Sequence, residues 1–170
     1  MYLHEAMRAE DKDEFLKEMT KEVDSHTDNE HWVIIKRSKV PKGHQVLPSV
    51  WAMRRKRRID TQEIYKWKAR LNLHGGKQTK GLNYWETYAP VAAWSTIRII
   101  MNLAAMMGWE TRQLDFVLAF PQAPVETELY MDIPKGFEVK GSNNQYVLKL
   151  KKNLYGQKQA GRVWYKHLTK

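Results

Sequence analysis

One carboxylate is notable for its sequence neighbours. Asp115 follows the segment Trp109–Leu114, which has the pattern of a short strand, and it precedes the apolar run Phe116-Val117-Leu118-Ala119-Phe120. A carboxylate buried among apolar groups is costly unless it is paired or bound to a metal. Two explanations are therefore open, a cap or salt bridge with a structural role and a metal ligand with a catalytic role.

A second chemical feature is a strand with one basic face. From Tyr65 to Leu73, apolar and polar residues alternate, and this two-residue period places Lys66, Lys68 and Arg70 on the same side. The pattern predicts a hairpin, because a strand beginning at residues 50–53 runs into the basic cluster 54–58 and a turn follows at 59–62.

The basic residues of the whole chain fall into two blocks. The net charge is +10, residues 51–80 hold ten bases and two acids, and residues 149–170 hold seven bases and no acid. Such blocks indicate a polyanionic partner such as nucleic acid. The simpler alternatives are a solvated surface and a localisation signal at residues 54–58.

Several classes of protein are excluded by composition. The 170 residues contain no cysteine, so there is no disulfide framework, cysteine zinc site or thiol nucleophile. The six histidines lack the spacing of metal ligands, and no Walker or dinucleotide-binding glycine motif is present. The apolar runs are too short for a membrane span, and the N-terminus lacks the regions of a signal peptide. We therefore expect an intracellular protein with no membrane partner, not a secreted one.

The elements that must position these residues predict an α+β fold. Helices are expected at residues 3–24, 95–107 and 159–168, and short strands at 32–35, 50–53, 65–73, 109–114, 129–133 and 146–150. Ser95 or Thr96 should cap the second helix, and Gly108 should end it. Its expected buried stripe contains Ile97, Ile100, Met101, Ala104 and either Leu103 or Met107.

Longer segments resemble one known family. QLDFVLAF, ELYMDIPKGFE and YVLKLKKNLYGQKQAGRVWYKHL, in this order, resemble the reverse transcriptase domain of copia-type LTR retrotransposons. IYKWKARLNLHGG is similar to the family's YKARLVAKG, and GLNYWETYAPV to its GIDYEETFAPV. The resemblance covers nearly the whole chain. It implies a right-hand polymerase with an antiparallel sheet and packed helices, with an N-terminal helix and fingers at about residues 1–108 and an early palm at about 109–170.

The resemblance also implies residue roles. Asp115 would be the first catalytic aspartate and would bind two Mg²⁺ ions together with the backbone of Phe116, with Mn²⁺ as the alternative metal. In the family these metals would activate the primer hydroxyl and stabilise the leaving pyrophosphate. Phe120 would be the aromatic gate that excludes a 2′-hydroxyl. The implied dNTP contacts are Arg55, Lys68, Arg70, Phe120 and Gln159. The implied nucleic-acid contacts are Arg54, Lys56, Arg57, Arg58, Lys158 and Arg162.

The sequence also departs from the family pattern. It contains no adjacent aspartate pair of the Tyr-x-Asp-Asp type, and one carboxylate cannot hold two Mg²⁺ ions. Gln157 and Gly161 stand where the family usually has Leu and Pro. We therefore expect a fragment of an RNA-directed DNA polymerase that is inactive alone. Its partners would be an RNA or DNA primer–template, dNTPs and the remaining polyprotein with RNase H and integrase, in a cytoplasmic particle or the nucleus. The alternatives are a non-catalytic nucleic-acid-binding module and a decayed pseudogene fragment.

Overall fold

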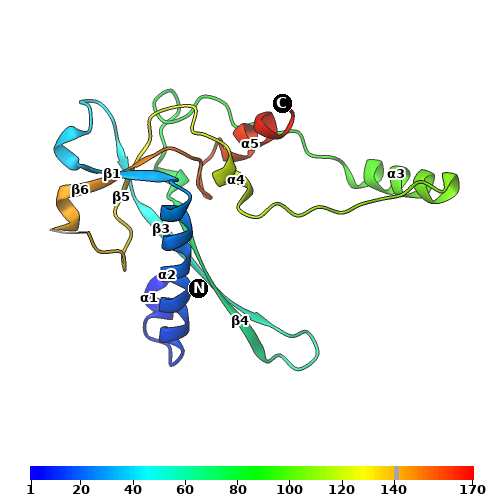
Figure 1. Ribbon diagram of the computed structural model, residues 1–170, viewed down its shortest axis with the longest axis horizontal. Helices are drawn as coiled ribbons and strands as arrows, with labels where there is room; N and C mark the ends of the chain where they lie inside the picture. The colour runs from blue at the N-terminus through cyan, green and yellow to red at the C-terminus, as the bar shows by residue number, and fades with distance from the viewer. Residues whose placement is uncertain (140–141) are drawn as a thin grey trace.

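The computed structural model describes residues 1–139 and 142–170 and has a mixed α+β fold (Figure 1). One sheet has the strand order β1-β6-β5-β2, and the other is the hairpin of β3 and β4. The strands are β1 (Trp32–Lys36), β2 (Val46–Leu47), β3 (Ser49–Arg57), β4 (Ile64–Leu73), β5 (Tyr130–Asp132) and β6 (Tyr146–Leu150). All pairs are antiparallel except β2 with β5, which is parallel. The predicted hairpin and the α+β class are confirmed.

The helices differ in length and in how well they are covered. They are α1 (Leu3–Ala6), α2 (Lys12–Asp28), α3 (Trp94–Met107), α4 (Ala119–Gln122) and α5 (Ala160–Leu168), with 3-10 turns η1 (Arg37–Lys39), η2 (Gly75–Lys77) and η3 (Asn143–Gln145). Within the described part of the chain, no helix is both long and apolar enough to cross a lipid bilayer.

Helix α2 covers one face of the β3–β4 hairpin. Phe15, Met19 and Val23 recur every four residues on α2 and are all buried, as expected for one apolar stripe. They belong to the same core cluster as Trp51 and Leu71 of the hairpin. This packing fixes the hairpin through its apolar face, and Lys66, Lys68 and Arg70 lie on the other face.

The expectation of one helix at residues 3–24 is wrong in detail. The helix breaks between Ala6 and Lys12, and α2 continues to Asp28. The break has a tertiary cause, because the Asp11 carboxylate at the start of α2 accepts hydrogen bonds from Arg55 and Trp67 of the hairpin. Periodicity along the helix carries no information about such a distant partner.

Helix α3 projects from the body on two extended segments (Figure 1). It ends at Gly108 as predicted, in the left-handed conformation with φ 66°, but its N-cap is Ala93, so neither Ser95 nor Thr96 caps it. Of the stripe predicted to be buried, only Ala104 is buried, and the others are exposed. The helix forms because its local sequence favours it, whereas its burial requires a facing layer that the described residues do not provide.

The strand predicted at residues 109–114 is also absent from the structure. Residues 109–116 have no regular secondary structure. An isolated extended segment leaves its backbone groups unpaired, so a strand forms only beside another strand. Within the described part of the chain no strand pairs with residues 109–116, and Asp115 therefore lies in an irregular exposed segment and not at the end of a strand.

Candidate functional site

Asp115 and the basic face of β4 line one open hollow. The hollow has a volume of about 410 Å³. Its lining comes from α2, β4, the segment before α4 and the segment after β6: Glu18, Glu22, Lys66, Lys68, Ala69, Arg70, Asp115, Phe116, Val117, Leu118 and Tyr155. The fold therefore brings together the predicted residues Lys68, Arg70, Asp115 and Phe116, although they are far apart in the sequence.

The hairpin register gathers positive charge on the face that borders this hollow. Arg70 lies opposite Ala52, Lys68 opposite Arg54, and Lys66 opposite Lys56, and directly opposed residues share a face. Repulsion from Lys56 is the main cause that lowers the pKa of Lys68, and burial and the other neighbouring bases act in the same direction. An anion bound here would relieve this repulsion.

Arg55 lies on the opposite face of the hairpin. It lies opposite Trp67 in the register, and its Nε and Nη2 each donate a 2.6 Å hydrogen bond to Asp11. These bonds from Arg55 are the largest cause that holds the pKa of Asp11 far below its usual range. The structure thus separates Arg55 from Lys68 and Arg70. Its predicted dNTP contact stays a prediction, while its observed partner is α2.

The other predicted bases of the hairpin lie toward its tip. Arg54, Lys56 and Arg57 line an open hollow with Tyr65, and Arg55 borders the same hollow from the other face of the strand. Arg57 donates a 2.8 Å hydrogen bond to the Gln62 carbonyl, and Arg58 lies over the ring of Tyr65 at 6.0 Å. The hairpin projects from the body (Figure 1), so this basic stretch is accessible to a long anionic chain.

The two aromatic residues after Asp115 are held by different contacts. Phe116 packs edge-on against Trp164 of α5, with ring centroids 5.2 Å apart. Phe120, in α4, packs against Tyr155 at 5.0 Å. Between them Leu118 has φ 50°, a left-handed backbone that costs a leucine about 1–2 kcal/mol. This turn redirects the chain between Phe116 and Phe120.

A close backbone contact between Leu73 and residues 155–156, the clasp, joins the segment after β6 to the end of β4. The Leu73 amide donates a 2.9 Å hydrogen bond to the Tyr155 carbonyl. Gly156 has φ +85°, and a Cβ at this position would lie 2.3 Å from the Leu73 carbonyl oxygen. A Cβ on Gly75 would lie 2.0 Å from the Gly156 carbonyl oxygen. Only residues without a side chain allow this approach, and the clasp places Tyr155 at the hollow.

Three predicted residues beyond this clasp are engaged with other protein groups. Gln159 is 2% exposed, and its side-chain oxygen accepts a 3.0 Å hydrogen bond from Gln78. The Lys158 ammonium contacts the Tyr84 hydroxyl at 3.2 Å. Arg162 pairs with Glu126 at 2.7 Å and with Glu86 at 3.2 Å. The structure does not bring these three side chains to the Asp115 hollow, and their predicted roles in dNTP and nucleic-acid binding stay predictions.

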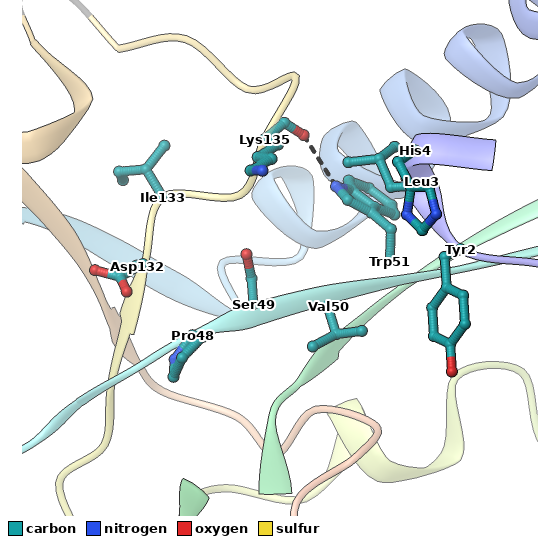
Figure 2. Close-up of a pocket in the computed structure, with 10 residues that line it drawn as sticks. All are labelled: Tyr2, Leu3, His4, Pro48, Ser49, Val50, Trp51, Asp132, Ile133 and Lys135. Carbon is teal, nitrogen blue, oxygen red and sulfur yellow. Dashed lines mark hydrogen bonds between the residues drawn. The ribbon is translucent and has the colours of Figure 1, made fainter. Parts of the chain in front are cut away.

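A second hollow, of about 350 Å³, lies between α1, β3 and the segment after β5 (Figure 2). Trp51 closes one side, and its indole Nε1 donates a 2.9 Å hydrogen bond to the Lys135 carbonyl. Asp132 lines it but is paired with Arg37 at 2.5 Å. This hollow has no concentration of like charge, so the Asp115 hollow is the better candidate.

A comparison with known protein families identifies the family of this chain. The profile of the family described as reverse transcriptase (RNA-dependent DNA polymerase) matches residues 29–170. The chain belongs to the reverse transcriptase family.

Similar proteins show the same relationship. The chain is 37% identical over 163 residues to a retrovirus-related Pol polyprotein from transposon TNT 1-94 of Nicotiana tabacum, covering 96% of the chain and 12% of the relative. It is 34% identical over 163 residues to the retrovirus-related Pol polyprotein from transposon RE2 of Arabidopsis thaliana, a match that covers 96% of the chain and 11% of the relative. It is 37% identical over 151 residues to the Pol polyprotein from transposon RE1 of the same plant, a match that covers 88% of the chain and 10% of the relative. No solved structure matches the chain. The resemblance to copia-type elements is confirmed, and the chain spans about a tenth of these relatives.

The divalent metal expected of a reverse transcriptase does not fit the residues of this structure. Among residues 1–139 and 142–170, no three histidine, aspartate or glutamate side chains are grouped so that they could hold a metal ion. Glu18 and Glu22 line the same hollow as Asp115 without forming such a group with it. The described residues therefore do not provide a complete metal centre.

Sequence reasoning missed three residues of this reverse transcriptase hollow. Glu18 and Glu22 belong to the polar positions of α2, which indicate only a solvated face. Tyr155 lies within the NLYG segment, and its ring is a side of the hollow. The sequence signal for Tyr155 was Gly156, the residue that follows it. A glycine that is required for close backbone contact also fixes the position of its neighbour.

Proposed function

We propose that this chain forms the fingers, at about residues 1–108, and the early palm, at about 109–170, of the RNA-directed DNA polymerase of a copia-type retrotransposon. Its Asp115 hollow would receive the incoming dNTP. The observation that carries this proposal is the meeting of Lys68, Arg70 and Asp115 around one hollow in a chain of this family. The partners would be a primer–template, dNTPs and the remaining polyprotein with RNase H and integrase. The site of action would be a cytoplasmic particle or the nucleus.

The basic face suits a triphosphate. A guanidinium offers paired N–H donors to phosphate oxygens, so Arg70 can make a two-point contact. Lys68 supplies a compact ammonium group, and repulsion from like-charged neighbours, Lys56 above all, lowers the pKa of this group. Phosphate binding would therefore be favoured by its own interactions and by the loss of repulsion within the hairpin.

Asp115 and Phe120 would act at the other end of the nucleotide. Asp115 is exposed, and among the described residues it forms no metal-binding group with Glu18 and Glu22 of the same hollow. It would therefore supply one carboxylate of a centre that other segments complete. Phe120 would lie beneath the sugar and exclude a 2′-hydroxyl. In this arrangement the described chain binds and orients a nucleotide, but does not contain the groups for transfer.

The experiment that tests this proposal is titration of the chain with dTTP. Arg70→Gln should weaken binding about tenfold, since a charged hydrogen bond contributes about 1.5–3 kcal/mol before solvent screening. Lys42→Gln, the same change of charge in the exposed loop before β2, should alter binding less than twofold. Equal losses in the two variants would show that dTTP responds only to net charge.

A primer-extension assay tests the expected inactivity. The 170-residue chain should give no product on a homopolymer template with Mg²⁺. The reason is that Asp115 alone provides too few ligands for two metal ions. Mg²⁺-dependent synthesis that disappears in Asp115→Asn would overturn this expectation.

The alternative function is a non-catalytic nucleic-acid-binding module. The observation that favours it is the basic stretch at the hairpin tip, which extends beyond the Asp115 hollow. Such a module would bind single strands with log K falling by about 0.7 per phosphate contact as log salt rises, or about 0.9 on duplex. It would show no specific loss of dTTP binding in Arg70→Gln, so the same variants decide between the two functions.

A further inference from the structure

The ring of Tyr155 contacts Arg70, which lines the Asp115 hollow, and Phe120, which does not line the hollow but has the implied role of sugar gate. The Arg70 guanidinium carbon is 4.2 Å from the centre of this ring. Phe120 packs against the same ring with centroids 5.0 Å apart and planes inclined by 43°. One aromatic side chain thus contacts the arginine of β4 and the aromatic residue of α4, which are 50 positions apart in the sequence.

The position of Tyr155 is fixed by backbone contacts. Its carbonyl accepts the Leu73 amide at 2.9 Å, and it forms a parallel bridge with Asn72, two residues from Arg70. Gly156 and Gly75 hold the two backbones in close contact. The backbone of Tyr155 is therefore bound to the end of β4, the strand that carries Arg70, at a fixed register to it.

The type of contact keeps Arg70 available to a ligand. None of the salt bridges among the described residues includes Arg70. An aromatic face attracts a guanidinium without using its N–H donors. A carboxylate would have used the same donors that a phosphate needs. The tyrosine face thus restricts the movement of the side chain and preserves its capacity for two-point binding.

We propose that Tyr155 is a positioning residue of the nucleotide site, which holds Arg70 over the hollow for the triphosphate and packs against Phe120. This role rests on the proposed function. It couples the two ends of the nucleotide, because a displaced ring releases both the phosphate contact and the sugar gate. Tyr155 itself need not touch the nucleotide.

The test compares Tyr155→Leu with Tyr155→Phe. Tyr155→Leu should weaken dTTP binding five- to tenfold. It should also reduce several-fold the ratio of the affinity for dTTP to the affinity for ribothymidine triphosphate. Tyr155→Phe keeps the aromatic face and should stay within twofold of the unaltered chain. In an Arg70→Gln background, Tyr155→Leu should cause little further loss of dTTP affinity. Melting temperatures identify any general loss of folding.

A second measurement needs no nucleotide. The Cδ protons of Arg70 should show an upfield ring-current shift in the NMR spectrum of the unaltered chain and of Tyr155→Phe. The shift should be lost in Tyr155→Leu. If Tyr155→Leu fails to fold, the shift in Tyr155→Phe and its dTTP affinity still decide, because the ring alone should suffice for both.

Different failures have different meanings. No dTTP binding by the unaltered chain would overturn the proposed function, and the role of Tyr155 with it. Normal dTTP binding by Tyr155→Leu would overturn the positioning role alone. The same would follow from a loss that persists undiminished in the Arg70→Gln background, or from an Arg70 signal without a ring-current shift.

Discussion

Replacing Gly156 by alanine should lower the free energy of unfolding by about 3 kcal/mol or more. The added Cβ would lie 2.3 Å from the Leu73 carbonyl oxygen and 3.1 Å from the Asn72 Cβ. The nearer atom is backbone in a paired strand and cannot move aside. Forced overpacking costs about 1–3 kcal/mol, and the left-handed backbone at φ +85° adds about 1–2 kcal/mol for a residue with a side chain. Urea denaturation followed by circular dichroism measures the change.

Gly43→Ala is the matched control for the Gly156 variant. Gly43 has φ +89°, nearly the same backbone, but a Cβ there would meet nothing within 4 Å. It should therefore show only the backbone cost of about 1–2 kcal/mol, and the difference between the variants measures the clasp. A Gly156→Ala chain no less stable than Gly43→Ala would mean that β4 and the NLYG segment are not rigidly joined.

Local sequence patterns predicted the elements whose partners lie in the same sheet or hairpin. The predicted alternation matches the burial along β4 from Ala69 to Leu73, although Tyr65 is exposed, and the short apolar segment 146–150 coincides with β6. The same patterns failed at residues 109–114 and at the stripe of α3. Both segments require a facing layer, and periodicity states which face is apolar without stating whether anything covers it.

The candidate site was predictable only in part, for a related reason. The resemblance identified Asp115, Lys68 and Arg70 as parts of one site, and the structure brings them to one hollow. It also implies a dNTP contact for Arg55, which stays a prediction. Successive strand residues face opposite sides, and the structure places Arg55 on the face that carries Trp67. Tyr155 was missed since its position depends on a backbone contact between distant segments.

Asp11→Asn should lower the free energy of unfolding by about 2 kcal/mol. The Asp11 carboxylate accepts hydrogen bonds of 2.6 Å from Arg55 Nε, Arg55 Nη2 and Trp67 Nε1. Asparagine keeps the shape but loses the charge, and its amide group would turn a donor toward these donors. Charged hydrogen bonds contribute about 1.5–3 kcal/mol each. The side chains of Arg55 and Asp11 are 22% and 21% exposed, so screening by solvent reduces the total.

The pH dependence of stability distinguishes this ion pair from simple packing. Hydrogen bonds from Arg55, the largest cause, and from Trp67 hold the pKa of Asp11 far below its usual range. A lowered pKa gives stability that is fully present above the unfolded-state pKa of about 3.9 and is lost as the pH falls below it. The unaltered chain should therefore lose stability below about pH 4 more steeply than Asp11→Asn.

Asp13→Asn provides the control, because it makes the same change of charge at an exposed position of α2. It should change the free energy of unfolding by less than about 0.5 kcal/mol and leave the acid dependence intact. Urea denaturation between pH 3 and 7 would compare the three proteins. Parallel curves for the unaltered chain and Asp11→Asn would show that Arg55 is not committed to α2. Its guanidinium would then be free for the nucleotide contact that the family resemblance implies.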